Sequence, residues 1–267
     1  MASKLLPKFF ILGVKNRFRG FELVNEIERQ GGICEIHWAQ TLEEIENFNR
    51  SSLKFQYFAI GRRLKFEEIS CALGHNEIYQ LIWKQGLTWG VVLEDDVQVV
   101  TELQKLSDYL FQSDQPTIIF LNSFPLNMSH ENDEVDHKIG IPNGLRKQFL
   151  PKNIACSYAI NFAAVDLIFK LGRNNLLSVA DWPYVWHRQV NFYQIEELFF
   201  SHSDDAKYSI IGNRNTSKEK FSVRIPNPIR VIRAILFGVP IRIAIENEVL
   251  VKTKLLYRQV KFKIGKR

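Results

Sequence analysis

The stretch Trp-Gly-Val-Val-Leu-Glu-Asp-Asp-Val at residues 89–97 decides which fold this chain is expected to adopt. An apolar run that ends in an acidic cluster is typical of a buried strand whose carboxyl end delivers polar groups to a cleft. Because side chains alternate along a strand, we expect Glu94 and Asp96 on one side and Asp95 on the other. Two carboxylates on one side suit Mn²⁺ or Mg²⁺, which prefer hard oxygen ligands. The alternative is a solvated acidic turn, in which the carboxylates only repel one another.

Strands and helices alternate on both sides of this stretch. Buried or strand-like runs lie at residues 8–14, 34–39, 117–121 and 154–162, and helical spacing of apolar residues covers 21–30, 64–84, 102–111 and 163–171. Gly31-Gly32 and Gly86 are expected to end two of these helices. The polar segment 122–148 is predicted to be a loop and a candidate mobile lid. The alternation predicts an α/β fold that begins with a right-handed βαβ unit.

The predicted helix before the acidic strand end carries a second candidate group. Glu68, Cys71, Ala72 and His75 lie three, four and seven residues apart and therefore share one helix face. A lone histidine on such a face is more often a hydrogen-bonded structural residue than a catalyst. Cys71 is predicted to pack, because a small thiol fits a close contact between a helix and a sheet.

Taken together, these features resemble glycosyltransferase family 25, the family of bacterial lipooligosaccharide galactosyltransferases with relatives among the collagen galactosyltransferases. The resemblance runs over residues 8–212 and rests on Phe10-Ile11-Leu12, Asn16-Arg17, Glu68, Cys71, His75, Trp83-Lys84, Glu94-Asp95-Asp96-Val97, Tyr158–Ala164, Asp181-Trp182-Pro183 and Ser209-Ile210. Gly74 and Asn161 depart from the family pattern, which has serine at both positions. Neither departure removes an acidic group, so they bear on the acceptor more than on the reaction class.

The resemblance implies a GT-A-like fold with a nucleotide-sugar donor at the carboxyl ends of the strands. Glu94 and Asp96 would hold Mn²⁺ or Mg²⁺ on the diphosphate, whose negative charge grows as the glycosidic bond breaks. Asp95 would lie nearby, toward the ribose. The family is taken to invert the sugar carbon, which requires a carboxylate to deprotonate the acceptor hydroxyl. We expect Asp181 to be this base; a helix N-cap or turn residue is the alternative.

Other donor-site residues and the substrates are also expectations from the resemblance. Arg17 would meet the diphosphate or the base at the end of the first strand, and Glu68 and His75 would form a polar network under the donor. UDP-galactose is the default donor, because it is the commonest in the family. The acceptor would be a sugar hydroxyl of a lipooligosaccharide, lipopolysaccharide or other surface glycan, and we expect this glycan to be linked to lipid.

The net charge of +6 is unevenly distributed along the 267 residues. Residues 221–267 hold 11 Lys/Arg and two acidic residues, whereas the remaining 220 residues have a small acidic excess. We therefore predict a catalytic domain at 1–220 and a basic amphipathic helical extension at 221–267. An apolar face flanked by Lys/Arg suits an anionic membrane surface; packing on the enzyme's own body is the alternative. Nucleic acid is a poor partner for an acidic body.

The location of the protein in the cell and two alternative functions can also be considered from the sequence. Three scattered cysteines favour reduced thiols, and neither a signal peptide nor a transmembrane helix is recognisable. We expect a cytoplasmic enzyme, peripheral on the inner face of the cytoplasmic membrane. A metal-dependent hydrolase or phosphodiesterase is disfavoured because the six histidines are widely separated. A non-catalytic protein that retains the fold is the third alternative.

Overall fold

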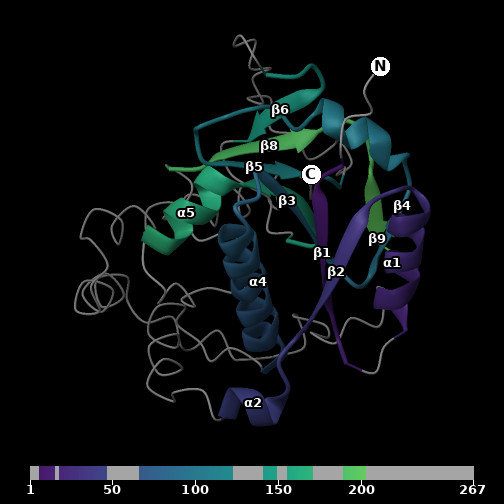
Figure 1. The fold of residues 1–267 in the computed structure, drawn as a ribbon, viewed down its shortest axis with the longest axis vertical. Helices are drawn as coiled ribbons and strands as arrows, with labels where there is room; N and C mark the ends of the chain where they lie inside the picture. Colours follow the sequence, from purple (N-terminus) through teal and green to yellow (C-terminus); the bar gives the residue numbers. More distant parts are fainter. Residues whose placement is uncertain are drawn as a thin grey trace, which may run out of the picture. The chain divides into compact units, whose positions relative to one another are not determined.

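The computed structural model describes residues 6–15, 18–46, 66–122, 141–148, 155–170 and 189–202 (Figure 1). Over these ranges the chain is a mixed α/β structure, which confirms the α/β part of the predicted fold class. The predicted extension at 221–267 lies outside the described residues, as does its boundary at residue 220. No helix in the described ranges is long and apolar enough to cross a membrane.

The chain begins with the predicted βαβ unit. Strand β1 (Lys8–Gly13) is followed by helix α1 (Arg19–Arg29) and strand β2 (Ile33–Trp38), and β2 pairs with β1 in parallel. Gly31 ends α1 with a positive φ of 82°, where the backbone N–H groups of Gly31 and Gly32 donate to the carbonyl oxygens of Glu28 and Ile27, both at 2.9 Å. These are the two bonds of a Schellman motif, which glycine at this position favours.

One seven-stranded sheet, in the order β2-β1-β3-β7-β5-β8-β6, organises the described part of the chain. The strands not yet bounded are β3 (Trp89–Glu94), β5 (Thr117–Phe120), β6 (Leu145–Gln148), β7 (Ser157–Asn161) and β8 (Asn191–Ile195). All strands run in the direction of β1 except β7 and β6, which are antiparallel to their neighbours. The carboxyl ends of β1, β2, β3, β5 and β8 therefore lie at the same edge as the amino ends of β7 and β6.

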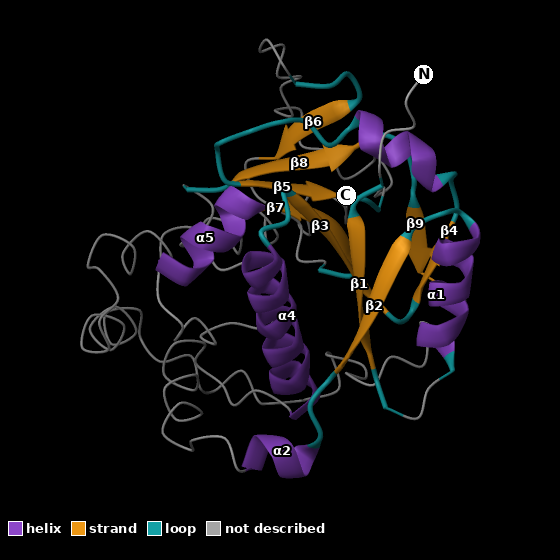
Figure 2. Cartoon of the chain, in the orientation of Figure 1, coloured by secondary structure: helices purple, strands orange, loops and turns teal. Residues whose placement is uncertain are grey.

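Both faces of the sheet are covered (Figure 2). Helices α4 (Phe66–Gln85) and α5 (Phe162–Lys170) pack on one face, where Phe10, Val92 and Tyr158 point into a core with Ile78 and Ile82. The other face has its own core, covered by α1, the 3-10 helix η1 (Leu103–Asp108) and a small sheet of β4 (Val97–Val99) with β9 (Phe200–His202). A short helix, α2 (Leu42–Glu46), follows β2. Alternate residues of each central strand serve opposite cores, as expected for a sheet buried on both sides.

Two glycines let α4 lie close to the sheet. A Cβ atom on Gly74 of α4 would collide with the Leu12 side chain of β1. A Cβ on Gly90 of β3 would lie 2.6 Å from Cδ1 of Ile82, which belongs to α4. The helix therefore approaches β1 and β3 at both of these points, and the first of them directly precedes His75.

The structure corrects the predicted elements in two places. The predicted loop at 122–148 is wrong at its carboxyl end, because Leu145–Gln148 form β6, an antiparallel partner of β8; residues 123–140 of the proposed lid lie outside the described ranges. The helix predicted at 102–111 is the shorter 3-10 helix η1. Strands β4, β8 and β9 were not predicted, since they are only three to five residues long and mix apolar with polar side chains.

Candidate active site

The acidic cluster lies at the edge of the sheet where the five parallel strands end. Glu94 is the last residue of β3, and its backbone N–H donates to the carbonyl oxygen of Cys156, just before β7, at 2.8 Å. Asn122 follows the end of β5 at the same edge. Ligand sites of α/β sheets form beyond the carboxyl ends of the strands, so this edge is the natural position for one.

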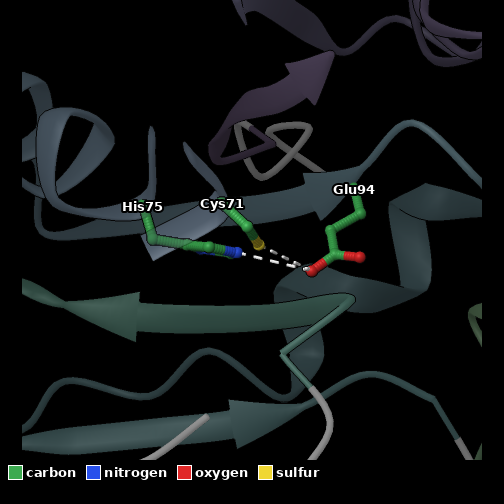
Figure 3. A group of neighbouring side chains, drawn as sticks. All are labelled: Cys71, His75 and Glu94. Carbon is green, nitrogen blue, oxygen red and sulfur yellow. Dashed lines mark hydrogen bonds and ion pairs between the residues drawn. The ribbon is translucent and has the colours of Figure 1, made fainter. Parts of the chain in front are cut away.

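Glu94 is held by two side chains of α4, as Figure 3 shows. Its Oε1 atom lies 3.5 Å from Nε2 of His75 and accepts a hydrogen bond from Sγ of Cys71 at 3.7 Å. Cys71 and His75 are one helical turn apart, which brings both to the same carboxylate. Burial by itself would raise the pKa of Glu94, but His75 and Cys71 outweigh it and hold this pKa below its ordinary value. Glu94 is therefore an ionised carboxylate beside the polar side chains of Cys71 and His75.

His75 is part of a buried chain of polar groups that joins α4 to β7. Its side chain is almost fully enclosed, and Nδ1 lies 2.8 Å from the hydroxyl of Tyr158, which lies 2.7 Å from the hydroxyl of Tyr79. The rings of His75 and Tyr158 also stack, with centroids 5.8 Å apart. Burial raises the pKa of both tyrosines, so both remain neutral hydroxyls. His75 thus belongs to a buried polar network, and the position of this network under the donor stays a prediction.

Asp96 has the most perturbed carboxyl group of the cluster. Burial, followed by the neighbouring charge of Glu94, raises the pKa of Asp96 to about 6. Its side chain is 14% exposed, with Oδ1 3.9 Å from Nδ1 of His202 on β9. Within the described residues, this buried Oδ1 accepts no hydrogen bond. A carboxylate oxygen that is buried, unbonded and close to a second carboxylate fits a cation ligand.

Asp95 has a different role from its two neighbours. Its Oδ2 accepts a hydrogen bond from the backbone N–H of Val14 at 3.2 Å, and its own N–H donates to the carbonyl oxygen of Leu12 at 3.1 Å. Asp95 thus ties the turn after β3 to the end of β1. That Glu94 and Asp96 share one side stays a prediction. The predicted separation of Asp95 from Glu94 agrees with their contacts, which are with the end of β1 and with α4 respectively. Its cause differs, because β3 ends at Glu94 and the aspartates form a turn.

Three predicted site residues remain, namely Glu68, Arg17 and Asp181. Glu68 is only 3% exposed, and it lies in the first turn of α4. Seven residues separate it from His75, which is about 10 Å along a helix axis. Arg17 and Asp181 lie outside the described residues.

Four residues at this edge were not recognised as site residues from the sequence. Cys71 was expected only to pack, yet its Sγ contacts Glu94. Tyr158 was noted only as part of a matching segment, and His202 had no local signal at all. Asn122 donates from Nδ2 to Sγ of Cys156 at 3.4 Å, while its buried Oδ1 has no hydrogen-bond partner in the described ranges. A polar residue directly after an apolar strand was the available signal for Asn122.

The arrangement combines an ionised carboxylate, a second carboxyl of raised pKa and acceptor atoms that nothing in the described structure satisfies. Such a site is suited to a divalent cation and the anionic group that the cation would hold. The chemistry that it supports is the stabilisation of negative charge that develops on a departing group.

Comparison with known proteins agrees with the family predicted from the motifs. Residues 8–140 match the family model described as glycosyltransferase family 25 (LPS biosynthesis protein). No curated protein sequence matches the chain.

Solved structures give weaker likenesses. A glycosyltransferase involved in the glycosylation of the major capsid of PBCV-1 shares 13% identity at a TM-score of 0.37, covering 74% of this chain and 93% of that one. A putative glucose-1-phosphate thymidylyltransferase from Bacillus anthracis, in complex with a sucrose, shares 10% identity at a TM-score of 0.40, covering 73% and 89%. At these TM-scores neither likeness defines the fold of this chain.

Proposed function

Residues 8–140 belong to glycosyltransferase family 25, and from this premise we propose that the protein is an inverting, metal-dependent hexosyltransferase. The observation that carries the proposal concerns two carboxylates at one strand end. The charge of Glu94 acts on Asp96, and Oδ1 of Asp96 is buried without a hydrogen-bond partner in the described ranges. The site would take a nucleoside diphosphate sugar, with UDP-galactose as the donor that we propose first.

Mn²⁺ or Mg²⁺ is the cofactor that the residues fit. Glu94 and Asp96 would hold the ion, whose positive charge would offset the charge that builds on the diphosphate. Burial and, after it, repulsion from Glu94 raise the pKa of Asp96, and a bound cation would offset this repulsion. Arg17 would contribute a further positive charge toward the diphosphate, and Asp95 would approach the ribose.

The chain's own residues orient and activate the reactants. His75 and Cys71 fix the Glu94 carboxylate from below, and the hydrogen bonds of Asp95 keep the ends of β1 and β3 in register. Glu68 would extend the polar network under the donor. We assign the general base to Asp181, which would take the proton of the acceptor hydroxyl as this oxygen attacks the anomeric carbon from the side opposite the diphosphate. Attack from that side inverts the configuration.

We further propose that the acceptor is a lipid-linked glycan of the lipooligosaccharide or lipopolysaccharide type. The description of the matching family as an LPS biosynthesis protein supports this choice. The basic excess of residues 221–267 would bring the enzyme to an anionic membrane surface, from the cytoplasmic side, where such an acceptor is presented. Residues 1–220 would hold the transferase activity.

A transfer assay tests the proposal. The full-length protein is incubated with a panel of nucleotide sugars and lipooligosaccharide acceptors, with Mn²⁺ or with a chelator, and the anomeric configuration of the product is determined by NMR. We expect transfer that requires both acceptor and metal and that Asp96→Asn abolishes. Release of the sugar to water at the same rate with and without acceptor would instead identify a hydrolase. Normal Mn²⁺-dependent transfer by both Asp96→Asn and Glu94→Gln would disprove the metal assignment.

A further inference from the structure

We propose that Cys71, His75 and Glu94 form a binding site for Zn²⁺, distinct in its ligand chemistry from the site for a hard cation at Asp96. This site goes beyond the proposed transferase function and does not depend on it. Sulfur, imidazole nitrogen and carboxylate oxygen are the donor set that zinc takes in proteins, whereas Mg²⁺ and Mn²⁺ prefer oxygen ligands.

The positions of the three side chains suit a tetrahedral ion. One ligand atom from each of Cys71, His75 and Glu94 lies within 4.8 Å of the other two. Glu94 Oε1 is 3.5 Å from His75 Nε2 and 3.7 Å from Cys71 Sγ, and the three side chains converge in Figure 3. Zinc bonds of roughly 2.0–2.3 Å in tetrahedral geometry separate neighbouring ligand atoms by about 3.3–3.7 Å. The two distances from Glu94 Oε1 already fall in this range.

An unsatisfied buried nitrogen points into this group. His75 is 2% exposed, and its Nε2 has no hydrogen-bond partner in the described part of the chain. The other ring nitrogen, Nδ1, is engaged by the hydroxyl of Tyr158 at 2.8 Å. A histidine that binds a metal through one nitrogen commonly donates from the other to an oxygen, which fixes its tautomer and orientation. Tyr158, supported by Tyr79, supplies such an oxygen.

Without a metal ion, hydrogen bonds alone leave His75 Nε2 without a partner among the described residues. If Nε2 carries the ring proton, this N–H lies 3.5 Å from Glu94 Oε1 without hydrogen-bond geometry; if Nδ1 carries it, the lone pair of Nε2 faces Glu94. An ion between the three groups satisfies all of them at once. Since Oε1 is the oxygen directed at Cys71 and His75, the second oxygen of the same carboxylate stays available to the donor-site cation.

Cobalt substitution of the metal-free, full-length protein tests the site. Co²⁺ bound to a thiolate in tetrahedral geometry gives a charge-transfer band in the near ultraviolet and d–d bands in the visible. We expect both sets of bands at one equivalent of Co²⁺ and their loss on addition of Zn²⁺. The absence of a thiolate-to-cobalt band from the wild-type protein would overturn the proposal.

Matched cysteine variants assign the band. Cys71→Ser should lose it, whereas Cys34→Ser should keep it, because Cys34 on β2 donates to the carbonyl oxygen of Val24 instead. A band that persists in Cys71→Ser would mean that another thiol binds the ion, which overturns the proposal. Circular dichroism verifies that each variant is folded.

Tyr158→Phe leaves all three ligands in place and probes the site even if Cys71→Ser does not fold. Loss of the hydrogen-bond partner of a ligating histidine lowers metal affinity by about 10- to 100-fold, so the cobalt titration should shift by that factor. An unshifted titration would contradict the role of Tyr158. Asp96→Asn should retain the cobalt bands while losing Mn²⁺-dependent transfer, so that failure of the zinc site and failure of the transferase proposal give different results.

Discussion

The imidazole of His75 and the hydroxyl of Tyr158, 83 residues apart in the chain, meet at 2.8 Å beneath the acidic end of β3. Helix α4 supplies the histidine, and β7 supplies the tyrosine directly beside β3 in the sheet. The Tyr158 hydroxyl also contacts that of Tyr79, so a single oxygen joins two positions of the helix to the sheet.

Removal of this oxygen should destabilise the protein measurably. Tyr158→Phe leaves the buried Tyr79 hydroxyl and His75 Nδ1 short of a partner, which costs about 1–3 kcal/mol. Urea unfolding monitored by circular dichroism measures the loss. Tyr109→Phe is the matched control, because its hydroxyl donates to Glu197 at 3.2 Å in a partly buried position; its cost should be below about 1 kcal/mol. Equal costs for the two variants would contradict the importance of the buried chain.

Gly74→Ala should destabilise the protein even though alanine is the better helix former. The added methyl group meets Leu12, a core residue that is 5% exposed and has little room to move. Overpacking of a core costs about 1–3 kcal/mol, which exceeds the gain in helix propensity of up to about 1 kcal/mol. Leu12→Val removes the colliding atom, so the double variant should be more stable than the sum of the single effects indicates. Strict additivity in the unfolding experiment would show that the two residues do not interact.

Asn161 should matter for stability and not for acceptor choice. Its Oδ1 accepts from the backbone N–H groups of Thr117 and Ala164, each at 2.9 Å, and its Nδ2 donates to the carbonyl oxygens of Ser113 and Gln115. Asn161 thus caps α5 at the edge of the sheet opposite to the acidic cluster, since it pairs with Trp89, the first residue of β3.

Asn161→Ala should therefore cost about 2–3 kcal/mol, the sum of a lost cap and lost buried hydrogen bonds. Asn161→Ser, which restores the residue type of the family pattern, should cost less because a serine hydroxyl also caps a helix. At a temperature where both variants are folded, their KM for the acceptor should equal that of the wild type. A changed KM for the acceptor would show that Asn161 does affect acceptor binding.

Asp181→Asn should slow transfer by about 10²- to 10⁴-fold if Asp181 is the general base, with donor binding unchanged. Single-turnover kinetics and calorimetric titration with the donor nucleotide measure the two effects separately. Asp166→Asn is the control, since this surface carboxylate of α5 pairs with Lys170 at 2.5 Å, and its rate should change less than about twofold. A loss below tenfold in Asp181→Asn would assign the base to another carboxylate.

The basic extension should bind anionic membranes through its charge. Co-sedimentation with vesicles that contain phosphatidylglycerol should retain the full-length protein at low salt and release it as the ionic strength rises. A chain that ends at Lys220 should stay in the supernatant. Equal sedimentation of both chains, or binding that is insensitive to salt, would favour packing of the extension on the enzyme's own body.

The sequence predicted the central strands well because burial on both faces requires continuous apolar runs, as in β1, β3 and β5. The edge strand β6, Leu145–Gln148, carries Arg and Lys and has no such run, so its pairing with β8 depends on tertiary contacts. The acidic strand end was recognisable because it directly follows such an apolar run. Helical periodicity put Cys71 on the correct face of α4, but it contains no information on the register that sets its thiol against Glu94. Tyr158, Asn122 and His202 reach the site from separate strands, and a single sequence does not reveal which strands are neighbours.

The position of β7 has a consequence for synthesis of the protein on the ribosome. This strand lies between β3 and β5 and joins β2-β1-β3 to β5-β8-β6, although it is made after β1, β2, β3 and β5. Until residues 157–161 have left the exit tunnel, β3 has no partner on one side. Unpaired strand edges of this kind attract other chains. The nascent protein therefore passes through a period in which its most apolar strands are exposed to pairing errors, and its dependence on chaperones should be greatest between the synthesis of β3 and that of β7.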